Sequence, residues 1–202
     1  MSETGIKKRI EGKMNTEKEK NLVSNHPAQH RSLIHMVYTA VLAAALCVCS
    51  IVSVTIGDVP ITLQTFAVCT AAALLGCKSG AACVLVYVLL GAVGLPVFAG
   101  MTGGVGILCG CTGGYIIGFI FTALIVGFAA EKFDRSLPAL LISMSLGVLV
   151  CYAFGTPWFM FVTKYDFATS LGFCVTPFIA FDAIKIVLSA VIVNRLSKII
   201  KL

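Results

Sequence analysis

The stretch TGGYIIGFIFTALIVGFAA, residues 112–130, runs for nineteen residues without a charged side chain. A helix of that length measures about 28 Å, close to the thickness of the hydrocarbon core of a bilayer. Five further apolar runs are separated by short breaks: 33–56, 61–77, 79–97, 137–161 and 175–197. The sequence therefore predicts an all-α membrane protein, a bundle of six transmembrane helices.

The composition supports this class. Hydrophobic residues make up 58% of the 202-residue chain and charged residues only 12%, whereas soluble domains carry about 25% charged residues. One core of this size cannot hide so much apolar surface, so the surplus faces lipid. The second and third runs are short and separated only by Cys77-Lys78-Ser79, which predicts a tight helical hairpin.

The first 32 residues are polar and mixed in charge, and they lack the apolar stretch and cleavage site of a signal peptide. They are interpreted as a disordered cytoplasmic tail ahead of a single membrane domain, residues 33–202. With the N-terminus inside, 13 of the 15 basic residues fall on the inner side, and Lys164 alone on the outer side. The positive-inside rule then places both termini in the cytoplasm.

Two charged residues interrupt the last apolar run. Asp182 and Lys185 are three residues apart and so share one helix face, which Ser189 extends by a turn. Ionisable groups inside a span are costly, and they usually face a cavity or the bundle interior. Asp182 and Lys185 are therefore candidate ligand-binding residues; the alternative is a self-neutralising pair that only fixes helix packing.

Glycine is concentrated in one segment. Ten of the 19 glycines lie between Gly91 and Gly118, so this segment is not a regular span throughout. Irregular backbone at membrane depth survives where it is buried in protein or lines a cavity. Residues 98–114 are predicted to cap an outward-facing cavity together with residues 57–65, and loop N–H groups near Gly103 and Gly104 are candidate ligand contacts.

Three weaker signals complete the candidate set. Gln64 offers a donor and an acceptor near the predicted height of Asp182. Tyr87 lies on a face with small residues, where a ligand contact and simple packing are both compatible with the pattern. Ala40 and Ala44 form a small-xxx-small pair that lets another helix approach closely, from this chain or from a partner.

Several kinds of chemistry have no signature in the chain. Most of the nine cysteines lie in apolar runs, and neither Cys47–Cys49 nor Cys109–Cys111 has a histidine nearby, so neither a metal site nor a disulfide is expected. No ATP-binding phosphate loop, zinc-protease motif or nucleophile elbow occurs. These observations favour a binding protein without its own energy source over an enzyme; a channel is also disfavoured, because the polar residues gather in the outer half.

Three segments together resemble the BioY family, the biotin-binding S components of energy-coupling-factor (ECF) transporters. They are VPITLQTFAV (59–68), GAVGLPVFAGMTGGVGILCGCTGGYIIGF (91–119) and PFIAFDAIKIVL (177–188). The resemblance spans about residues 33–197. One departure is Cys109-Gly-Cys111, where the family more often has proline near Cys111.

The resemblance implies capture of biotin from outside a bacterial cell membrane, without catalysis and without a cofactor in this chain. Uptake is then powered by a transmembrane coupling subunit and two ATPase subunits, which use ATP. It implies that Asp182 and Lys185 bind the ligand, that Ala40 and Ala44 dock the coupling subunit, and that Tyr115 belongs to the site. An S component for another vitamin, of the thiamine or riboflavin class, is the alternative.

The ligand's chemistry matches these residues. The ureido ring of biotin carries two N–H donors and one carbonyl, and its side chain ends in a carboxylate. The Asp182 carboxylate can accept the N–H groups, while Lys185 balances its charge or donates to the ureido oxygen. Gln64 and the glycine-rich loop can close over the ligand. Chemical matching alone does not decide which end of the ligand meets which residue.

Overall fold

The computed structural model describes residues 33–56 and 59–199. Contacts divide the chain into Met1–Val37 and Tyr38–Leu202. Residues 33–37 begin the first helix, and the other described residues belong to the second unit. The predicted tail 1–32 and the turn 57–58 lie outside the described residues, so the tail and its boundary with the membrane domain remain predictions.

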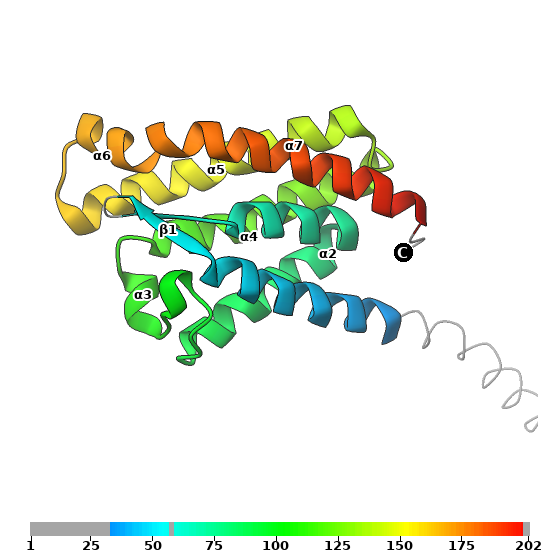
Figure 1. The fold of residues 1–202 in the computed structure, drawn as a ribbon, viewed down its shortest axis with the longest axis horizontal. Helices are drawn as coiled ribbons and strands as arrows, with labels where there is room; N and C mark the ends of the chain where they lie inside the picture. The colour runs from blue at the N-terminus through cyan, green and yellow to red at the C-terminus, as the bar shows by residue number, and fades with distance from the viewer. Residues whose placement is uncertain (1–32, 57–58, 200–202) are drawn as a thin grey trace, which may run out of the picture. The chain divides into compact units, whose positions relative to one another are not determined.

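Helices dominate the described chain (Figure 1). The elements after the first helix, Leu33–Ile51, are β1 (Ser53–Ile56), β2 (Val59–Thr62), α2 (Gln64–Ala92), the 3-10 helix η1 (Ala99–Met101), α3 (Val105–Cys109), α4 (Gly113–Lys132), α5 (Leu137–Thr163), α6 (Phe167–Cys174) and α7 (Thr176–Ile199). Among the described residues, five helices can cross a membrane by length and composition: the first helix, α2, α4, α5, and α6 with α7.

Helix α2 folds back on itself at Gly76, whose φ is 82° and ψ is −176°. A Cβ on Gly80 would lie 2.7 Å from Ala72 Cα, and the side chain of Gln64 hydrogen-bonds to Tyr87. In a continuous helix these pairs would be about 12 Å and about 35 Å apart. The predicted hairpin is thus confirmed, with its break one residue earlier than expected, and α2 supplies two of six long helical segments.

Two charged side chains at and just after the C-terminal end of α4 bond to the backbone on either side of this break. Glu131 accepts a hydrogen bond from the Cys77 amide at 3.0 Å, at the start of the second half of α2. Arg135 donates to the carbonyls of Ala73 and Leu74 at 2.9 and 3.0 Å, at the end of the first half. Each charge therefore faces the helix terminus whose dipole it complements, and it satisfies backbone groups that the break leaves free.

The prediction of a helix over 33–56 was wrong at its end. The first helix stops at Ile51, and residues 53–56 and 59–62 form the two antiparallel strands of a β-hairpin, in which Ser53 pairs with Thr62. The run Val52-Ser53-Val54-Thr55-Ile56 is rich in β-branched residues, which favour strands, yet its hydropathy alone is that of a span. The description all-α is accordingly incomplete, and the helix predicted over 61–77 begins only at Gln64.

The glycine-rich segment is irregular, as predicted, but it is not all loop. Helix α2 ends at Ala92, before Gly94 with φ 107°, whereas a span to residue 97 was predicted. The segment then contains η1 and α3 before α4 begins. It contacts the β-hairpin where the Gly100 amide donates to Ser53 Oγ at 3.1 Å.

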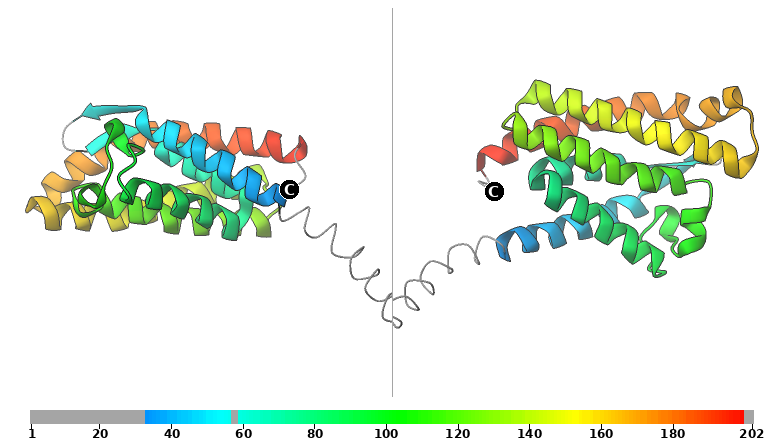
Figure 2. Two further views of the ribbon diagram at one scale, coloured as in Figure 1. Left: turned by 90° about the horizontal axis from the view of Figure 1, so that it is seen from below. Right: turned by 180° about the vertical axis from the view of Figure 1, so that it is seen from behind.

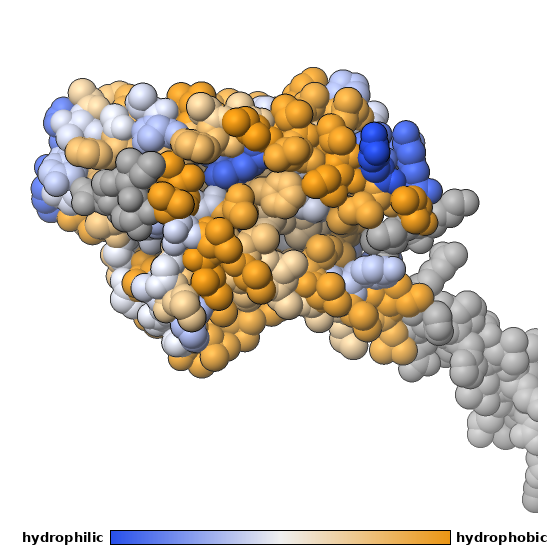
Figure 3. Space-filling model, in the orientation of Figure 1, coloured by the Kyte–Doolittle hydropathy of each residue, from blue (hydrophilic) through white to orange (hydrophobic). Residues whose placement is uncertain are grey.

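Helix α4 lies between α2 and α5 (Figure 2). Glycines allow the close approach: a Cβ on Gly118 would lie 3.0 Å from Cys151 Cα, and Thr122 donates to the Gly147 carbonyl at 2.8 Å. The face shown in Figure 3 is mostly apolar, with hydrophilic residues toward its two ends and one hydrophilic group near its middle. Exposed apolar side chains such as Phe128 and Ile184 suit contact with lipid.

Candidate functional site

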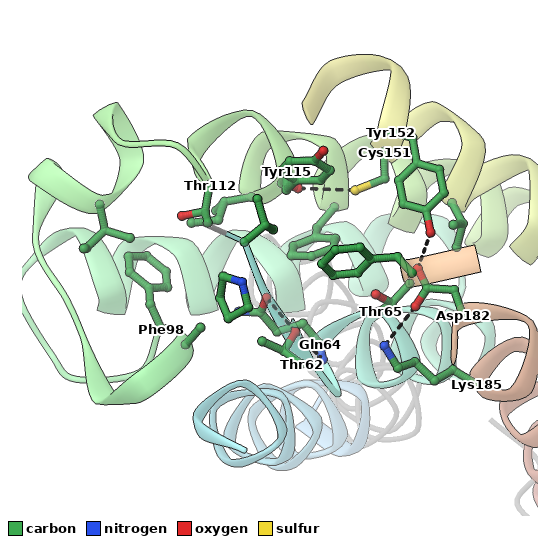
Figure 4. A pocket seen from close by; sticks show the side chains of 18 of the residues that line it. Thr62, Gln64, Thr65, Phe98, Thr112, Tyr115, Cys151, Tyr152, Asp182 and Lys185 are labelled. Carbon is green, nitrogen blue, oxygen red and sulfur yellow. Dashed lines mark hydrogen bonds and ion pairs between the residues drawn. The ribbon is translucent and has the colours of Figure 1, made fainter. Parts of the chain in front are cut away.

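The two intramembrane charges predicted from sequence meet a third polar group (Figure 4). Lys185 Nζ lies 2.9 Å from Asp182 Oδ1, and the Tyr152 hydroxyl donates to Asp182 Oδ2 at 2.6 Å. Asp182 and Lys185 come from one face of α7 and are only 4% and 7% exposed, whereas Tyr152 comes from α5. A buried carboxylate is thus neutralised by one neighbour and hydrogen-bonded by another.

This cluster lies on the wall of a cavity of about 220 Å³. The wall is built by β2, α2, the glycine-rich segment, α4, α5 and α7. Its residues are Val59, Pro60, Thr62, Gln64, Thr65, Phe98, Ala99, Thr102, Ile107, Thr112, Tyr115, Ile116, Phe119, Val148, Cys151, Tyr152, Phe178, Asp182 and Lys185. A mostly apolar wall with a few converging polar groups is typical of a small-molecule site.

Gln64 lies on the cavity wall but is already bonded on its far side. Its Nε2 donates to Ser50 Oγ and to the Tyr87 hydroxyl, both at 2.5 Å, and its Oε1 accepts from Thr62 at 3.1 Å. Ser50 and Tyr87 also bond to each other at 2.7 Å. Tyr87, a candidate ligand contact, therefore lies behind Gln64, and its phenol links the first helix to both halves of α2.

The remaining candidates are distributed over three places. Tyr115 lies on the cavity wall, and its hydroxyl is 3.4 Å from Thr156 Oγ1. Gly103 and Gly104 lie in the glycine-rich segment, where the Gly104 amide donates to the Gly91 carbonyl at 2.7 Å; neighbouring residues, not these two, are on the cavity wall. Ala40 and Ala44 are exposed on the first helix.

Tyr152 is the main residue that sequence reasoning missed. It is a single tyrosine in the apolar run of α5, with no charged neighbour to mark it. Only the packing of α5 against α7 brings it to Asp182. Ser189, by contrast, was predicted from its spacing to lie on the same helix face as Asp182, one turn beyond Lys185. Its Oγ lies 2.9 Å from Thr70 Oγ1.

Metal-ligand groupings are absent from the described part of the chain, where no three His, Cys, Asp or Glu side chains gather. All nine cysteines are free thiols. Cys151 is on the cavity wall, and its Sγ donates weakly to the Tyr115 carbonyl at 3.5 Å. The polar chemistry of this cavity therefore comes from a carboxylate, an ammonium group, an amide and hydroxyl groups.

A Tyr87→Phe substitution tests whether the network behind Gln64 is structural. Tyr87 is fully buried, so removing its hydroxyl leaves Ser50 and Gln64 each short of a partner. We expect a loss of about 1–2 kcal/mol in the free energy of unfolding, seen as a lower melting temperature in detergent. Tyr165→Phe removes a hydroxyl from an exposed residue and should leave the melting temperature unchanged; equal effects of the two substitutions would contradict this interpretation.

Comparison with known proteins gives consistent matches. The model of the BioY family matches residues 18–202. The "Biotin transporter BioY" of Thermotoga maritima is 42% identical over 165 residues, which cover 81% of this chain and 96% of that protein. "Biotin transporter BioY2" of Lactococcus lactis is 34% identical over 161 residues, covering 79% and 88%.

A solved structure agrees with the fold. The crystal structure of "the S-component for biotin from an ECF-type ABC transporter" superposes with a TM-score of 0.78 at 33% identity. The match covers 84% of this chain and 93% of that one. The arrangement of helices described above is therefore shared with an S component over nearly its whole length.

Proposed function

The chain belongs to the BioY family, and from that premise we propose that it is the biotin-capturing subunit of a vitamin uptake transporter. The family resemblance predicted from three sequence segments is thereby confirmed. Relatives that carry the name biotin transporter match most of their own length, so the proposal concerns the whole membrane domain. It is a multi-pass membrane protein that binds its ligand and releases it unchanged, without catalysis.

The observation that carries the proposal is the Asp182–Lys185–Tyr152 cluster on the wall of the 220 Å³ cavity. A buried carboxylate held between an ammonium and a phenol has acceptor capacity left over, because each oxygen accepts about two hydrogen bonds. An N–H group of the biotin ureido ring fits that capacity. The apolar wall fits the ring carbons and the thioether.

The other end of the ligand is assigned to the covering segments. We place the biotin carboxylate toward the glycine-rich segment, whose amides and Thr112 hydroxyl supply donors near the cavity. Gln64 also lines the cavity, and Tyr87 holds it in place by a hydrogen bond from behind. Tyr115 borders the site, and Gly103 and Gly104 shape its cover.

Energy has to come from partner subunits in this proposal. Two ATPase subunits would use ATP, and a transmembrane coupling subunit would be the third partner. This is in line with the transporter class named for the solved relative. We place the chain in the cell membrane of a bacterium, with both termini in the cytoplasm because 13 of 15 basic residues then lie inside. The cavity end, with the β-hairpin and α3, faces outward.

Ala40 and Ala44 are proposed to receive the coupling subunit. Both are exposed one helical turn apart, which allows a partner helix to approach closely. We expect Ala44→Leu to abolish co-purification with the coupling subunit, because the added side chain separates the two helices, while biotin affinity stays unchanged. Ala153→Leu on the exposed face of α5 is the matched control; loss of the complex in both variants would argue against this docking face.

Binding of radiolabelled biotin to the full chain purified in detergent tests the function directly. A ligand that binds only the folded state stabilises it by about 2.7 kcal/mol at a hundred times its Kd, so a melting-temperature panel adds a second readout. Biotin should raise the melting temperature, and thiamine and riboflavin should not. A shift with either of those vitamins and none with biotin would replace the proposed ligand.

A further inference from the structure

The Gln64 amide has one side toward the cavity and the other toward a buried polar network. Ser50 and Tyr87, which bond its Nε2, do not line the cavity, whereas Thr62, which bonds its Oε1, does. We propose that Gln64 is a specificity-determining residue that offers the ligand a hydrogen-bond acceptor and no donor, because Ser50 and Tyr87 fix the orientation of its amide. This inference rests on the proposed function and deepens it.

The number of hydrogens in the network decides which end of the amide lies behind. The Ser50 hydroxyl, the Tyr87 hydroxyl and the rear amide atom of Gln64 form a triangle with sides of 2.7, 2.5 and 2.5 Å. Each side needs one hydrogen, and the two hydroxyl groups supply only two. An amide oxygen at the third corner would leave one short contact without a hydrogen, whereas an NH₂ group supplies two more. The NH₂ group therefore points away from the cavity.

The front of the amide is left with acceptor capacity only. Thr62 Oγ1 donates its single hydrogen to Gln64 Oε1 at 3.1 Å and accepts from the Gln64 backbone amide at 3.2 Å. A carbonyl oxygen accepts about two hydrogen bonds, so Oε1 has one position left. Neither side chain has a further hydrogen to offer the cavity. This part of the wall therefore favours an N–H group of the ligand and disfavours its carboxylate.

Biotin has a donor for this acceptor. The two N–H bonds of its ureido ring point to opposite sides of the ring carbonyl, so one carboxylate meets only one of them. Asp182 is on α7 and Gln64 is at the start of α2, and both line the same cavity (Figure 4). Asp182 accordingly takes one ureido N–H and Gln64 Oε1 takes the other, and the ligand carboxylate is left to the glycine-rich segment.

The test uses biotin and two derivatives that carry a methyl group on one or the other ureido nitrogen. The Kd of each derivative is divided by the Kd of biotin, on purified full chain and its variants. Gln64→Met keeps the length of the side chain but removes the acceptor. One of the two ratios should then fall about three- to tenfold, because the hydrogen bond that methylation destroys is already missing. The other ratio, which reports on Asp182, should keep its wild-type value.

Two further variants test the orientation of the amide. Gln64→Glu restores an acceptor oxygen at the front, so both ratios should be at least those of wild type. Ser50→Ala removes one corner of the triangle, and the remaining groups can be paired with the amide either way round; the affected ratio should fall between those of wild type and Gln64→Met. Ser143→Ala is the matched control, because Ser143 is buried, bonds the Leu140 carbonyl at 3.1 Å and does not line the cavity. It should change neither ratio.

Each outcome decides the question. If wild type binds biotin but Gln64→Met leaves both ratios unchanged, Gln64 accepts no ligand N–H and the inference fails alone. Unchanged ratios in Ser50→Ala would contradict the role given to the network behind Gln64. If the wild-type chain binds no biotin, the proposed function falls and takes the inference with it. Melting temperatures show which variants are folded, and Ser50→Ala carries the test if Gln64→Met does not fold.

Discussion

Asp182→Asn will weaken biotin binding by about 10- to 100-fold, the equivalent of one hydrogen bond to a charged group. Asparagine keeps the size of the side chain but replaces one acceptor oxygen by an NH₂ donor. That donor faces either Tyr152 or Lys185, which themselves donate to the carboxylate, and it offers nothing to a ureido N–H. The measurement is the Kd of radiolabelled biotin for purified protein.

A second variant separates binding from folding. Removing one partner of a buried ion pair costs about 3–5 kcal/mol, since the other charge is left uncompensated. The double variant Asp182→Asn with Lys185→Gln is neutral and should fold better than the single variant, yet it should still bind biotin poorly.

Asp166→Asn is the matched control for the same change. Asp166 is exposed and caps α6 by accepting from the Thr169 amide at 3.4 Å, a role that asparagine also fills. Wild-type affinity in Asp182→Asn would remove Asp182 from the site.

The ion pair was predictable because its signal is local. Asp182 and Lys185 lie three residues apart in an apolar run, so any helix through them puts both on one face, whatever the rest of the fold does. The hairpin at Gly76 was predictable for a similar reason, because two short apolar runs meet at a single lysine. Features that depend on hydropathy and spacing within one element follow from the sequence.

Features that depend on contacts between elements could not be predicted from the sequence. Tyr152 meets Asp182 only because α5 and α7 pack together, and nothing in the α5 run distinguishes its tyrosine from a packing residue. The orientation of Tyr87 toward Gln64 and Ser50 likewise depends on how α2 folds back against the first helix. The β-hairpin was missed because Val52 and Val54 contribute the same hydropathy to a strand as to a span.

Gly76→Ala will lower the free energy of unfolding by about 2–4 kcal/mol. The backbone of Gly76, with φ 82° and ψ −176°, is in a region that is essentially restricted to glycine, and an alanine there costs about 1–3 kcal/mol in strain. A Cβ at this position would also clash with Glu131 Oε1. Glu131 would have to move away and release the Cys77 amide, which adds the cost of a lost hydrogen bond.

The expected readout for Gly76→Ala is a melting temperature roughly 5–15 °C below wild type. Gly172→Ala is the matched control: Gly172 is exposed in α6, and a Cβ there meets nothing within 4 Å. Alanine is favoured over glycine inside a helix by roughly 0.5–1 kcal/mol, so this control should be neutral or slightly stabilising. Because the point where α2 folds back lies at the opposite end of the bundle from α3 (Figure 1), and no residue near Gly76 lines the cavity, the folded Gly76→Ala protein should bind biotin with nearly wild-type affinity. An unchanged melting temperature would mean that the chain can reverse between the halves of α2 without a glycine at this position.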